Sequence, residues 1–298
     1  MTVVQRILPS WFKQKIPNKN KIDSMKESFA QLGIYTVCEH SYCPNMGSCW
    51  SAGVATFMIL GDRCTRACRF CAVESGQAKE VDPFEPCHVA QAVKRLGLKY
   101  VVVTSVTRDD LEDQGAAQFS KTIQEIKASV PGIRIEVLVP DFLGNENLIK
   151  IVLDAEPSVF GHNLETVKRL STLFRPQADY ERSLNVLRLA KQLNPGIFTK
   201  SGLMVGLGET KQEVKQAMRD LRAAGCDLLT IGQYLAPSKK ERHVCVDRFV
   251  LPDEFKEYKT FGMSIGFGHV LSGPLVRSSY LAEDGYQNCL NRLKGLDI

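Results

Sequence analysis

Residues 37–73 read VCEHSYCPNMGSCWSAGVATFMILGDRCTRACRFCAV and carry six of the ten cysteines of the chain. They form two triplets, one spaced C-x4-C-x5-C and one spaced C-x3-C-x2-C: Cys38, Cys43 and Cys49, then Cys64, Cys68 and Cys71. A tetrahedral zinc site takes four ligands, and disulfides use cysteines in pairs. Three thiolates can instead hold a [4Fe–4S] cluster and leave one iron free for another ligand. The spacing therefore favours iron–sulfur sites.

An apolar run, TFMIL at residues 56–60, leads into the second triplet, and Phe70 stands just before its third cysteine. This arrangement resembles the signature of the radical S-adenosylmethionine (SAM) enzymes. The resemblance implies that the second triplet holds a [4Fe–4S] cluster and that Phe70 belongs to the cofactor site. It also implies that SAM chelates the fourth iron and is cleaved to a 5′-deoxyadenosyl radical. A zinc knuckle is the alternative interpretation of the same spacing.

The first triplet narrows the resemblance. CEHSYCPNMGSCW at residues 38–50 resembles the auxiliary-cluster motif of the lipoyl synthase family, and RSSY at residues 277–280 matches a C-terminal motif of that family. The match covers roughly residues 26–282. It implies a second [4Fe–4S] cluster on the first triplet, with Ser279 rather than Ser278 as its fourth ligand. An alkoxide is a harder ligand than a thiolate and binds iron less well, which suits a ligand that is released during turnover.

The resemblance also implies a reaction, the insertion of two sulfur atoms at C6 and C8 of an octanoyl chain held on a lysine of a carrier domain. These C–H bonds are unactivated, so a radical supplied by a cofactor is needed. The implied cofactors are two [4Fe–4S] clusters and two SAM molecules per lipoyl group, with the auxiliary cluster giving the sulfur. Two alternatives remain: another radical SAM sulfur-inserting enzyme that acts on a free small molecule, and a zinc-stabilised binding module without activity.

The implied partners are macromolecular. They are octanoylated carrier domains (the E2 subunits of 2-oxoacid dehydrogenases and the glycine cleavage H protein), an electron donor such as flavodoxin or ferredoxin, and an iron–sulfur carrier for cluster repair. A net charge of +5 without a long Lys/Arg run gives little support for nucleic acid. No apolar run approaches the roughly 18 residues of a membrane helix, and residues 1–21 lack the apolar core of a secretory signal.

The compartment follows from the cysteines. Unpaired thiols at this density predict a reducing environment, so we expect a cytoplasmic location. The basic N-terminus, which has no acidic residue before Asp23, leaves a transit peptide as the alternative. Composition is that of an ordinary globular enzyme, with 44% hydrophobic and 24% charged residues.

After the second triplet, strand-like and helical segments alternate. The strand-like runs are residues 100–106, 134–140, 158–163, 199–206 and 228–234, and the helical segments are residues 86–96, 116–129, 146–153, 164–170, 180–193 and 211–224. With the strand at residues 56–61 this makes six β/α units, which predicts a parallel sheet with helices outside. Six units are two short of a complete (β/α)8 barrel. We therefore predict an α/β fold, a partial (β/α)6 TIM-type barrel that is open on one side.

Three regions follow from this pattern. Residues 1–53 form an N-terminal arm and the auxiliary-cluster loop, with no long helix expected in residues 1–25 and a short one at residues 25–32. Residues 54–250 form the radical SAM partial barrel. Residues 251–298 hold a helix at residues 252–263 and a tail carrying RSSY, which must fold back over the open face if that motif is to reach the clusters.

Polar residues near the carboxyl ends of the predicted strands are the candidates for binding SAM. Asn163 and Glu165 suit the ribose hydroxyls, although a helix N-cap with a first-turn acid explains them almost as well. Lys200 and Arg108 suit a carboxylate, with a salt bridge as the alternative. Residues 202–209, GLMVGLGE, resemble the glycine-rich strand that passes near adenine and methionine in radical SAM enzymes.

Overall fold

The computed structural model of the chain describes residues 8–13, 18–238 and 240–295. At its centre lies an eight-stranded sheet in the order β1-β2-β5-β6-β7-β8-β9-β10. All pairs from β2 to β10 are parallel, and β1 (Tyr35–Thr36) is antiparallel to β2. The parallel strands are β2 (Thr56–Ile59), β5 (Tyr100–Ser105), β6 (Arg134–Leu138), β7 (Val159–Gly161), β8 (Phe198–Val205), β9 (Leu228–Gln233) and β10 (His269–Gly273).

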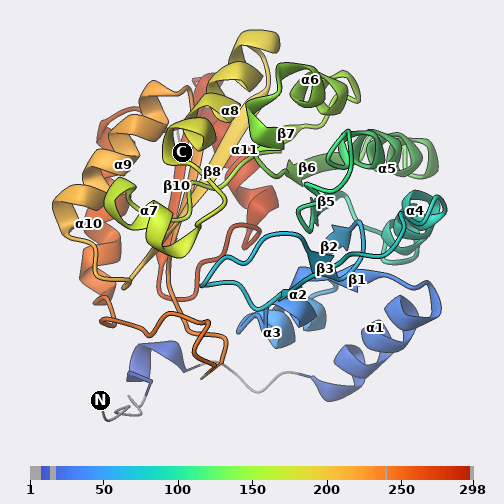
Figure 1. Cartoon of the computed structure of the whole chain (residues 1–298), viewed down its shortest axis with the longest axis horizontal. Helices are drawn as coiled ribbons and strands as arrows, with labels where there is room; N and C mark the ends of the chain where they lie inside the picture. The colour runs from blue at the N-terminus through green and yellow to red at the C-terminus, as the bar shows by residue number, and fades with distance from the viewer. Residues whose placement is uncertain (1–7, 14–17, 239, 296–298) are drawn as a thin grey trace.

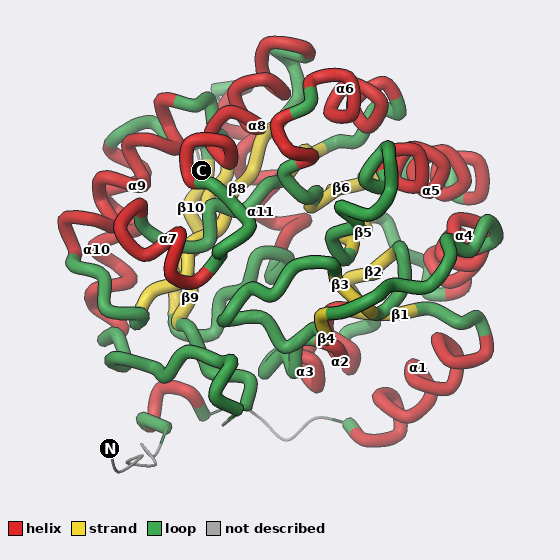
Figure 2. Tube along the Cα trace, in the orientation of Figure 1, coloured by secondary structure: helices red, strands yellow, loops and turns green. Residues whose placement is uncertain are grey.

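Helices cover the outer side of this curved sheet, and the strands line the inside (Figure 1). They are α4 (Glu85–Arg95), α5 (Ala116–Ser129), α6 (Glu146–Asp154), α8 (Tyr180–Leu193), α9 (Lys211–Ala223) and α10 (Pro252–Ser264). The short helix α7 (Lys168–Phe174) lies in front of them in Figure 1, and the carbonyl of its last residue accepts the backbone N–H of Arg69. Every residue of β9 is buried, as expected for a parallel strand covered on both faces. In Figure 2, mainly loops occupy the space between the short strand β4 (Glu74–Ser75) and β9, and the candidate site lies among these loops.

The six predicted strands are present in the predicted order, and the partial TIM-type barrel is confirmed. The sequence did not indicate β10, which pairs in parallel with β9 at the edge of the sheet. Its sequence, HVLSG, has one fully buried residue and lacks the apolar run by which the other strands were recognised. Helix α7 also begins later than predicted, at Lys168, because residues 163–167 form an irregular segment after β7.

The N-terminal region differs from the predicted arm. Helix α1 (Lys19–Gln31) begins six residues earlier than expected, because the side chain of Asn18 caps its first turn by accepting the backbone N–H of Lys21 at 3.3 Å. The remainder of the predicted arm lies partly outside the described residues; within it, η1 (Ser10–Phe12) is a single 3₁₀ turn. Phe29 of α1 packs edge-on against Trp50 and Phe57, which ties the N-terminal helices to β2.

The C-terminal tail crosses the open side of the barrel. On one edge its Val276 carbonyl lies directly over Gly232 of β9, and on the other the Ser279 hydroxyl meets Thr56, the first residue of β2. Helix α11 (Ala282–Leu293), which the sequence did not indicate, then packs Tyr286 against Tyr100 and Phe198 at the first residues of their strands. The proposed boundaries near residues 53 and 250 stay a prediction.

Candidate functional site

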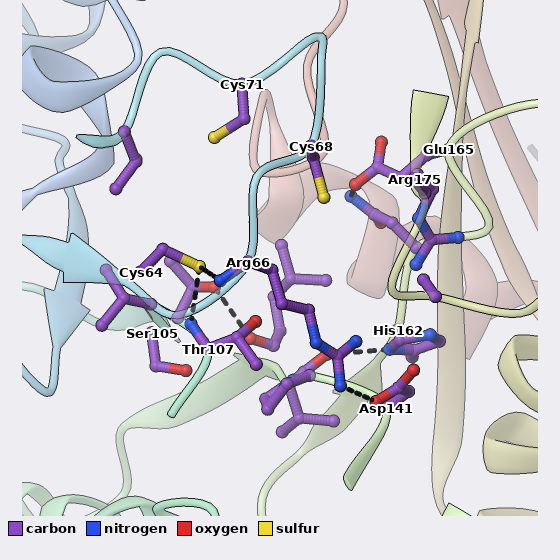
Figure 3. A pocket seen from close by; sticks show the side chains of 18 of the residues that line it. Cys64, Arg66, Cys68, Cys71, Ser105, Thr107, Asp141, His162, Glu165 and Arg175 are labelled. Atoms are coloured by element: carbon purple, nitrogen blue, oxygen red, sulfur yellow. Dashed lines mark hydrogen bonds and ion pairs between the residues drawn. The ribbon is translucent and has the colours of Figure 1, made fainter. Parts of the chain in front are cut away.

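The second cysteine triplet lies on the loop after β2, bracketed by the short paired strands β3 (Arg63–Cys64) and β4. The thiols of Cys64, Cys68 and Cys71 turn into the space that this loop surrounds (Figure 3), and all three line one pocket. Burial is the main cause that raises the pKa of Cys68 to about 11 and of Cys71 to about 12, and the neighbouring thiols of the triplet act in the same direction. The three sulfurs are therefore close together.

Backbone N–H groups already point at the first of these sulfurs. Cys64 Sγ accepts hydrogen bonds from the amides of Arg66 at 3.4 Å and Thr107 at 3.3 Å, as Figure 3 shows. Donors of this kind stabilise a metal-bound thiolate and tune the potential of a cluster. Burial disfavours a bare thiolate, so ligation at neutral pH would be accompanied by release of the thiol protons.

A buried ion network fixes the triplet loop to the barrel. Arg66, within the loop, donates to Asp109 and Asp141, each at 2.7 Å, and Arg182 of α8 donates to the other oxygen of Asp141 at 2.8 Å. Burial alone would raise the pKa of Asp141, but its hydrogen bonds and charge interaction with Arg66 hold that pKa well below the usual range. The loop is thus fixed to the segments that follow β5 and β6, and through Asp141 it is linked to α8.

Asn163 and Glu165 lie side by side on the opposite wall of the pocket. The side-chain amide of Asn163 donates to Glu165 Oε1 at 3.0 Å. Glu165 has a left-handed backbone (φ 68°) and joins β8 through its amide and carbonyl, which bond Gly202 and Met204. Because α7 begins only at Lys168, Asn163 caps no helix, and the alternative interpretation of these two residues is wrong.

Arg175 is a pocket residue that sequence reasoning missed. Its buried guanidinium donates to the Leu164 carbonyl at 2.9 Å and to Ser183 Oγ at 3.3 Å. Its charge opposes the burial-raised pKa of both Cys68 and Glu165. Arg175 follows the last residue of a short helix, and nothing in its local sequence marks it as a site residue. It can receive an anionic group beside Cys68.

His162 is a second pocket residue without a sequence signal. Its Nδ1 lies 2.9 Å from the Val139 carbonyl, while its buried Nε2 has no hydrogen-bond partner among the described residues. Burial, with the nearby charge of Arg175, lowers the pKa of His162 to about 4. The ring is therefore neutral at pH 7, with Nδ1 as the donor and Nε2 as a free acceptor.

The first triplet spans α2 (Val37–His40) and α3 (Met46–Ser51), with Cys43 on the turn between them. Burial raises the pKa of Cys49 to about 11, with further contributions from the charges of Cys38 and Cys43. The guanidinium of Arg277 in the tail opposes the burial-raised pKa of Cys43. These three thiols are therefore near one another, and the tail reaches them.

A second, larger cavity of about 440 Å³ joins the two triplets. Cys38 and Cys43 line it from one side, and Phe70 and Cys71 line it from the other. Ser278 and Ser279 also lie on its wall, with Asn163 and Glu165. Phe70, Cys71, Asn163 and Glu165 line the pocket of Figure 3 as well. Residues from both ends of the chain thus face one continuous space.

Lys200 does not reach this space. Its ammonium pairs with Glu136 Oε1 at 2.7 Å, and the Tyr100 hydroxyl donates to the other oxygen of Glu136 at 2.7 Å. The register of β8 places Lys200 beside Leu228, the first residue of β9, well before the carboxyl end of that strand. The structure therefore places Lys200 outside both cavities, contrary to the expectation from the sequence. Arg108 is buried and pairs with Asp110 at 2.8 Å, so its salt-bridge alternative holds.

Only the first residues of the glycine-rich segment 202–209 line the larger cavity. Gly202, Leu203 and Met204 line the larger cavity. Glu209, at its end, turns back and accepts the amides of Gly206 at 2.6 Å and Leu207 at 2.8 Å. The carboxylate of Glu209 therefore shapes its own loop.

The donor chemistry of both triplets fits clusters better than single ions. All six cysteines are free thiols. Among the described residues, which include these six, no three His, Cys, Asp or Glu side chains converge closely enough to hold one metal ion. A zinc ion needs its sulfur ligands at about 2.3 Å, whereas a cluster spreads its irons and takes thiolates that stand further apart.

In the described part of the chain, none of the helices is both long and apolar enough to cross a membrane.

Comparison with known proteins decides the family. A model of the Radical SAM superfamily matches residues 58–221, more than half of the chain. Lipoyl synthase of Caldanaerobacter subterraneus is 54% identical over 277 residues, covering 93% of this chain and 96% of that protein. Lipoyl synthase of Pyrobaculum calidifontis is 50% identical over 290 residues, covering 97% and 99%.

The chain belongs to the lipoyl synthase family. It is accordingly an enzyme of the radical SAM class, and membership implies a [4Fe–4S] cluster and SAM as cofactors. Solved structures agree in fold alone. Methylornithine synthase matches with a TM-score of 0.55 at 15% identity, over 93% of this chain and 77% of that one. HydG, a maturase of the [FeFe]-hydrogenase, matches with a TM-score of 0.57 at 17% identity, over 92% and 61%.

Proposed function

We propose that this lipoyl synthase family member inserts two sulfur atoms, at C6 and C8, into an octanoyl chain carried on a lysine of a carrier domain. The observation that carries the proposal is the shared cavity. Thiols from both triplets and the two serines of the tail line it together, so groups held by each triplet would face one substrate. Identity of 50–54% to lipoyl synthases over nearly the whole chain supports the same reaction.

Each triplet has its own part in this proposal. Cys64, Cys68 and Cys71 hold the cluster that binds SAM, beside Phe70, and Cys38, Cys43 and Cys49 with Ser279 hold an auxiliary cluster. When bound, these clusters and two SAM molecules supply the 5′-deoxyadenosyl radicals and the sulfur atoms that the reaction consumes. The side chains around them bind, orient and exclude water, because none has the acid–base strength to break an unactivated C–H bond.

The pocket residues suggest how SAM is bound. Asn163 and Glu165 offer an amide and a carboxylate for the ribose hydroxyls, and they already hydrogen-bond each other. Arg175, buried beside Cys68, takes the place that the sequence had suggested for Lys200 and would bind the carboxylate of SAM. Each of these contacts is oriented by the protein before SAM arrives, which reduces the entropy cost of binding.

The substrate side of the cavity is largely apolar. Met58, Leu138 and Leu203 line it, and these side chains suit an eight-carbon acyl chain. We infer octanoylated carrier domains as the substrate, and an electron donor such as flavodoxin or ferredoxin and an iron–sulfur carrier as further partners. The ten free thiols support a reducing, cytoplasmic location.

Mass spectrometry of an octanoylated carrier peptide tests the function. The peptide is incubated anaerobically with reconstituted protein, SAM and a reductant, and the expected product carries two additional sulfur atoms. Untethered octanoate and short free acids serve as competing substrates. Sulfur gained only by a free acid would point instead to a sulfur-inserting enzyme of small molecules, and no gain by any substrate would contradict the proposal.

A further inference from the structure

Two consecutive serines of the tail reach two different parts of the site. The Ser278 hydroxyl donates to Asn163 Oδ1 at 3.1 Å, and the Thr56 hydroxyl donates to Ser279 Oγ at 2.7 Å. Ser279 faces the side of the first triplet, whereas Asn163 belongs to the pocket of the second. One short turn, closed by a hydrogen bond from the Tyr280 amide to the Arg277 carbonyl at 2.9 Å, therefore touches both regions.

With the contact to Ser278, both polar atoms of the Asn163 side chain have a hydrogen-bond partner. Its Nδ2 donates to Glu165 at 3.0 Å, and its Oδ1 receives the Ser278 hydroxyl. Gly202 leaves just enough room underneath, since a Cβ there would lie 2.9 Å from Asn163 Oδ1. Because a carbonyl oxygen has two lone pairs, Oδ1 can accept a second donor while Ser278 stays in place.

The turn that presents Ser278 is itself closely seated. The Asn45 side chain, next to the first triplet, donates to the Leu275 carbonyl at 2.6 Å. On the barrel side, the Val276 carbonyl lies against Gly232, where no Cβ could be accommodated without a shift. A displacement of this turn would therefore carry the Ser278 hydroxyl away from Asn163.

We propose that Ser278 is a positioning residue for Asn163 and thereby couples SAM binding to the seat of the tail. This inference rests on the proposed function, in which Asn163 binds the ribose of SAM. Ser278 holds the amide with Nδ2 toward Glu165 and Oδ1 toward the Ser278 hydroxyl, so that both polar atoms are oriented before SAM enters. Coupling of two sites is reciprocal, so SAM binding stabilises the seated tail by the same factor by which the seated tail favours SAM.

The test compares SAM affinity of four anaerobically reconstituted full-length variants with wild type: Ser278→Ala, Asn163→Ala, the double variant, and Ser272→Ala as control. Ser272 lies on β10, and its buried hydroxyl has no partner among the described residues. Loss of one uncharged hydrogen bond corresponds to about a fivefold rise in the Kd of SAM for Ser278→Ala. The double variant should bind no more weakly than Asn163→Ala, because Ser278 acts through Asn163.

Iron content and the cluster absorbance of each variant are measured in parallel, and both should match wild type for Ser278→Ala. An unchanged Kd in Ser278→Ala, or additive losses in the double variant, would overturn the inference. The proposed function is judged separately, by wild-type protein alone. If wild type makes lipoyl product and Ser278→Ala binds SAM with wild-type affinity, only the proposed coupling is contradicted. If wild type neither binds SAM nor forms product, the proposed function itself is contradicted.

Discussion

The hydroxyl of Thr56 donates to Ser279 Oγ at 2.7 Å, joining residues 223 positions apart in the sequence. Thr56 opens β2, the strand between the two cysteine triplets, and Ser279 lies on the tail that crosses the open side of the barrel. The bond therefore anchors the tail to β2, which lies between the two triplets in the sequence. A donor at this position would also stabilise a negatively charged oxygen on Ser279.

Replacing Ser279 tests its proposed role as a ligand of the auxiliary cluster. Ser279→Ala removes one oxygen with little change in volume, so the protein should fold and still cleave SAM while sulfur insertion fails. Ser279→Cys should retain the cluster but slow turnover, because a thiolate binds iron more firmly. Product analysis and iron content, measured together, check both variants. Normal lipoyl formation by Ser279→Ala would show that this oxygen is not required.

The second triplet should control SAM cleavage. Cys68→Ala leaves two thiols around the space in Figure 3, too few to hold the proposed cluster, so 5′-deoxyadenosine formation should fall to background. Chromatography of the nucleoside products measures it. Cys245→Ala is the matched control, since Cys245 is exposed and belongs to neither triplet. Wild-type nucleoside yield from Cys68→Ala would refute the assignment of this triplet.

The first triplet should behave differently. Cys43→Ala should continue to form 5′-deoxyadenosine and yet transfer no sulfur, because radical formation and sulfur donation are assigned to separate thiol sets. Both products are measured in one reaction with an octanoylated peptide. A normal yield of lipoyl product from Cys43→Ala would exclude the auxiliary cluster as the sulfur source.

The buried Asp141 network should make stability depend on pH. Removing one partner of a buried ion pair costs about 3 kcal/mol, so Asp141→Asn should lower the free energy of unfolding by about this amount at pH 7. The folded pKa of Asp141 is depressed below its unfolded value of about 3.9. Its contribution is therefore complete above that unfolded pKa and is lost as pH falls toward the folded pKa.

Urea unfolding at pH 7 and at acidic pH measures the difference between wild type and Asp141→Asn, which should shrink on acidification. Asp154→Asn is the control, because its pair with Lys150 is largely exposed and should contribute below about 1 kcal/mol. A pH-independent difference would show that the lost stability comes from packing and not from the charge of Asp141.

Lys200 should matter for stability and not for SAM. Lys200→Met leaves Glu136 buried without its cation, which should cost about 3–5 kcal/mol, and Glu136→Gln in the same chain should restore part of it. The Kd of SAM should stay at its wild-type value in the double variant. Calorimetric titration with SAM and urea unfolding check the two parts. A weakened SAM affinity in a fully folded double variant would return Lys200 to the cofactor site.

The seat of the tail should depend on one glycine. In Gly232→Ala the new methyl would overlap the Val276 carbonyl, so the tail must move or β9 must distort. We expect more rapid proteolysis within residues 274–281 and weaker SAM binding. Ala substitution at the exposed Ser264, the last residue of α10, should change neither. Wild-type protection of the tail in Gly232→Ala would mean that the tail is held by its other contacts.

Local pattern was enough to predict the strands and both thiol triplets. Alternation of apolar runs with helical segments reports short-range order, and cysteine spacing reports ligands that are close along the chain. Helix α11 and strand β10 were not predicted, because neither segment contains an apolar run of the kind that marked the other elements. The position of Lys200 differs from the expected one for a related reason. How far along the barrel axis its side chain lies depends on the register of β8 against β9, and no local sequence pattern encodes that register.

Contacts between segments that are distant in the sequence could not be predicted from local pattern either. Arg175 follows a seven-residue helix in an unremarkable stretch, and only the folded chain brings its guanidinium beside Cys68. The bond between Ser278 and Asn163 joins residues 115 positions apart. The sequence indicated that both belong to functional motifs, yet their direct contact depends on how the tail is laid across the open side of the barrel.

Strand β2 also sets a distance between the segments that carry the two triplets. It is four residues long, about 13 Å, and it lies between the loops that carry the two triplets. It is fully buried and paired on both sides, by β1 and β5, so its length and direction are fixed. Under the proposed function, the source of the radical and the source of the sulfur therefore keep one separation throughout both insertions. Under the same proposal, the change from one carbon to the next would be made by movement of the acyl chain along the cavity.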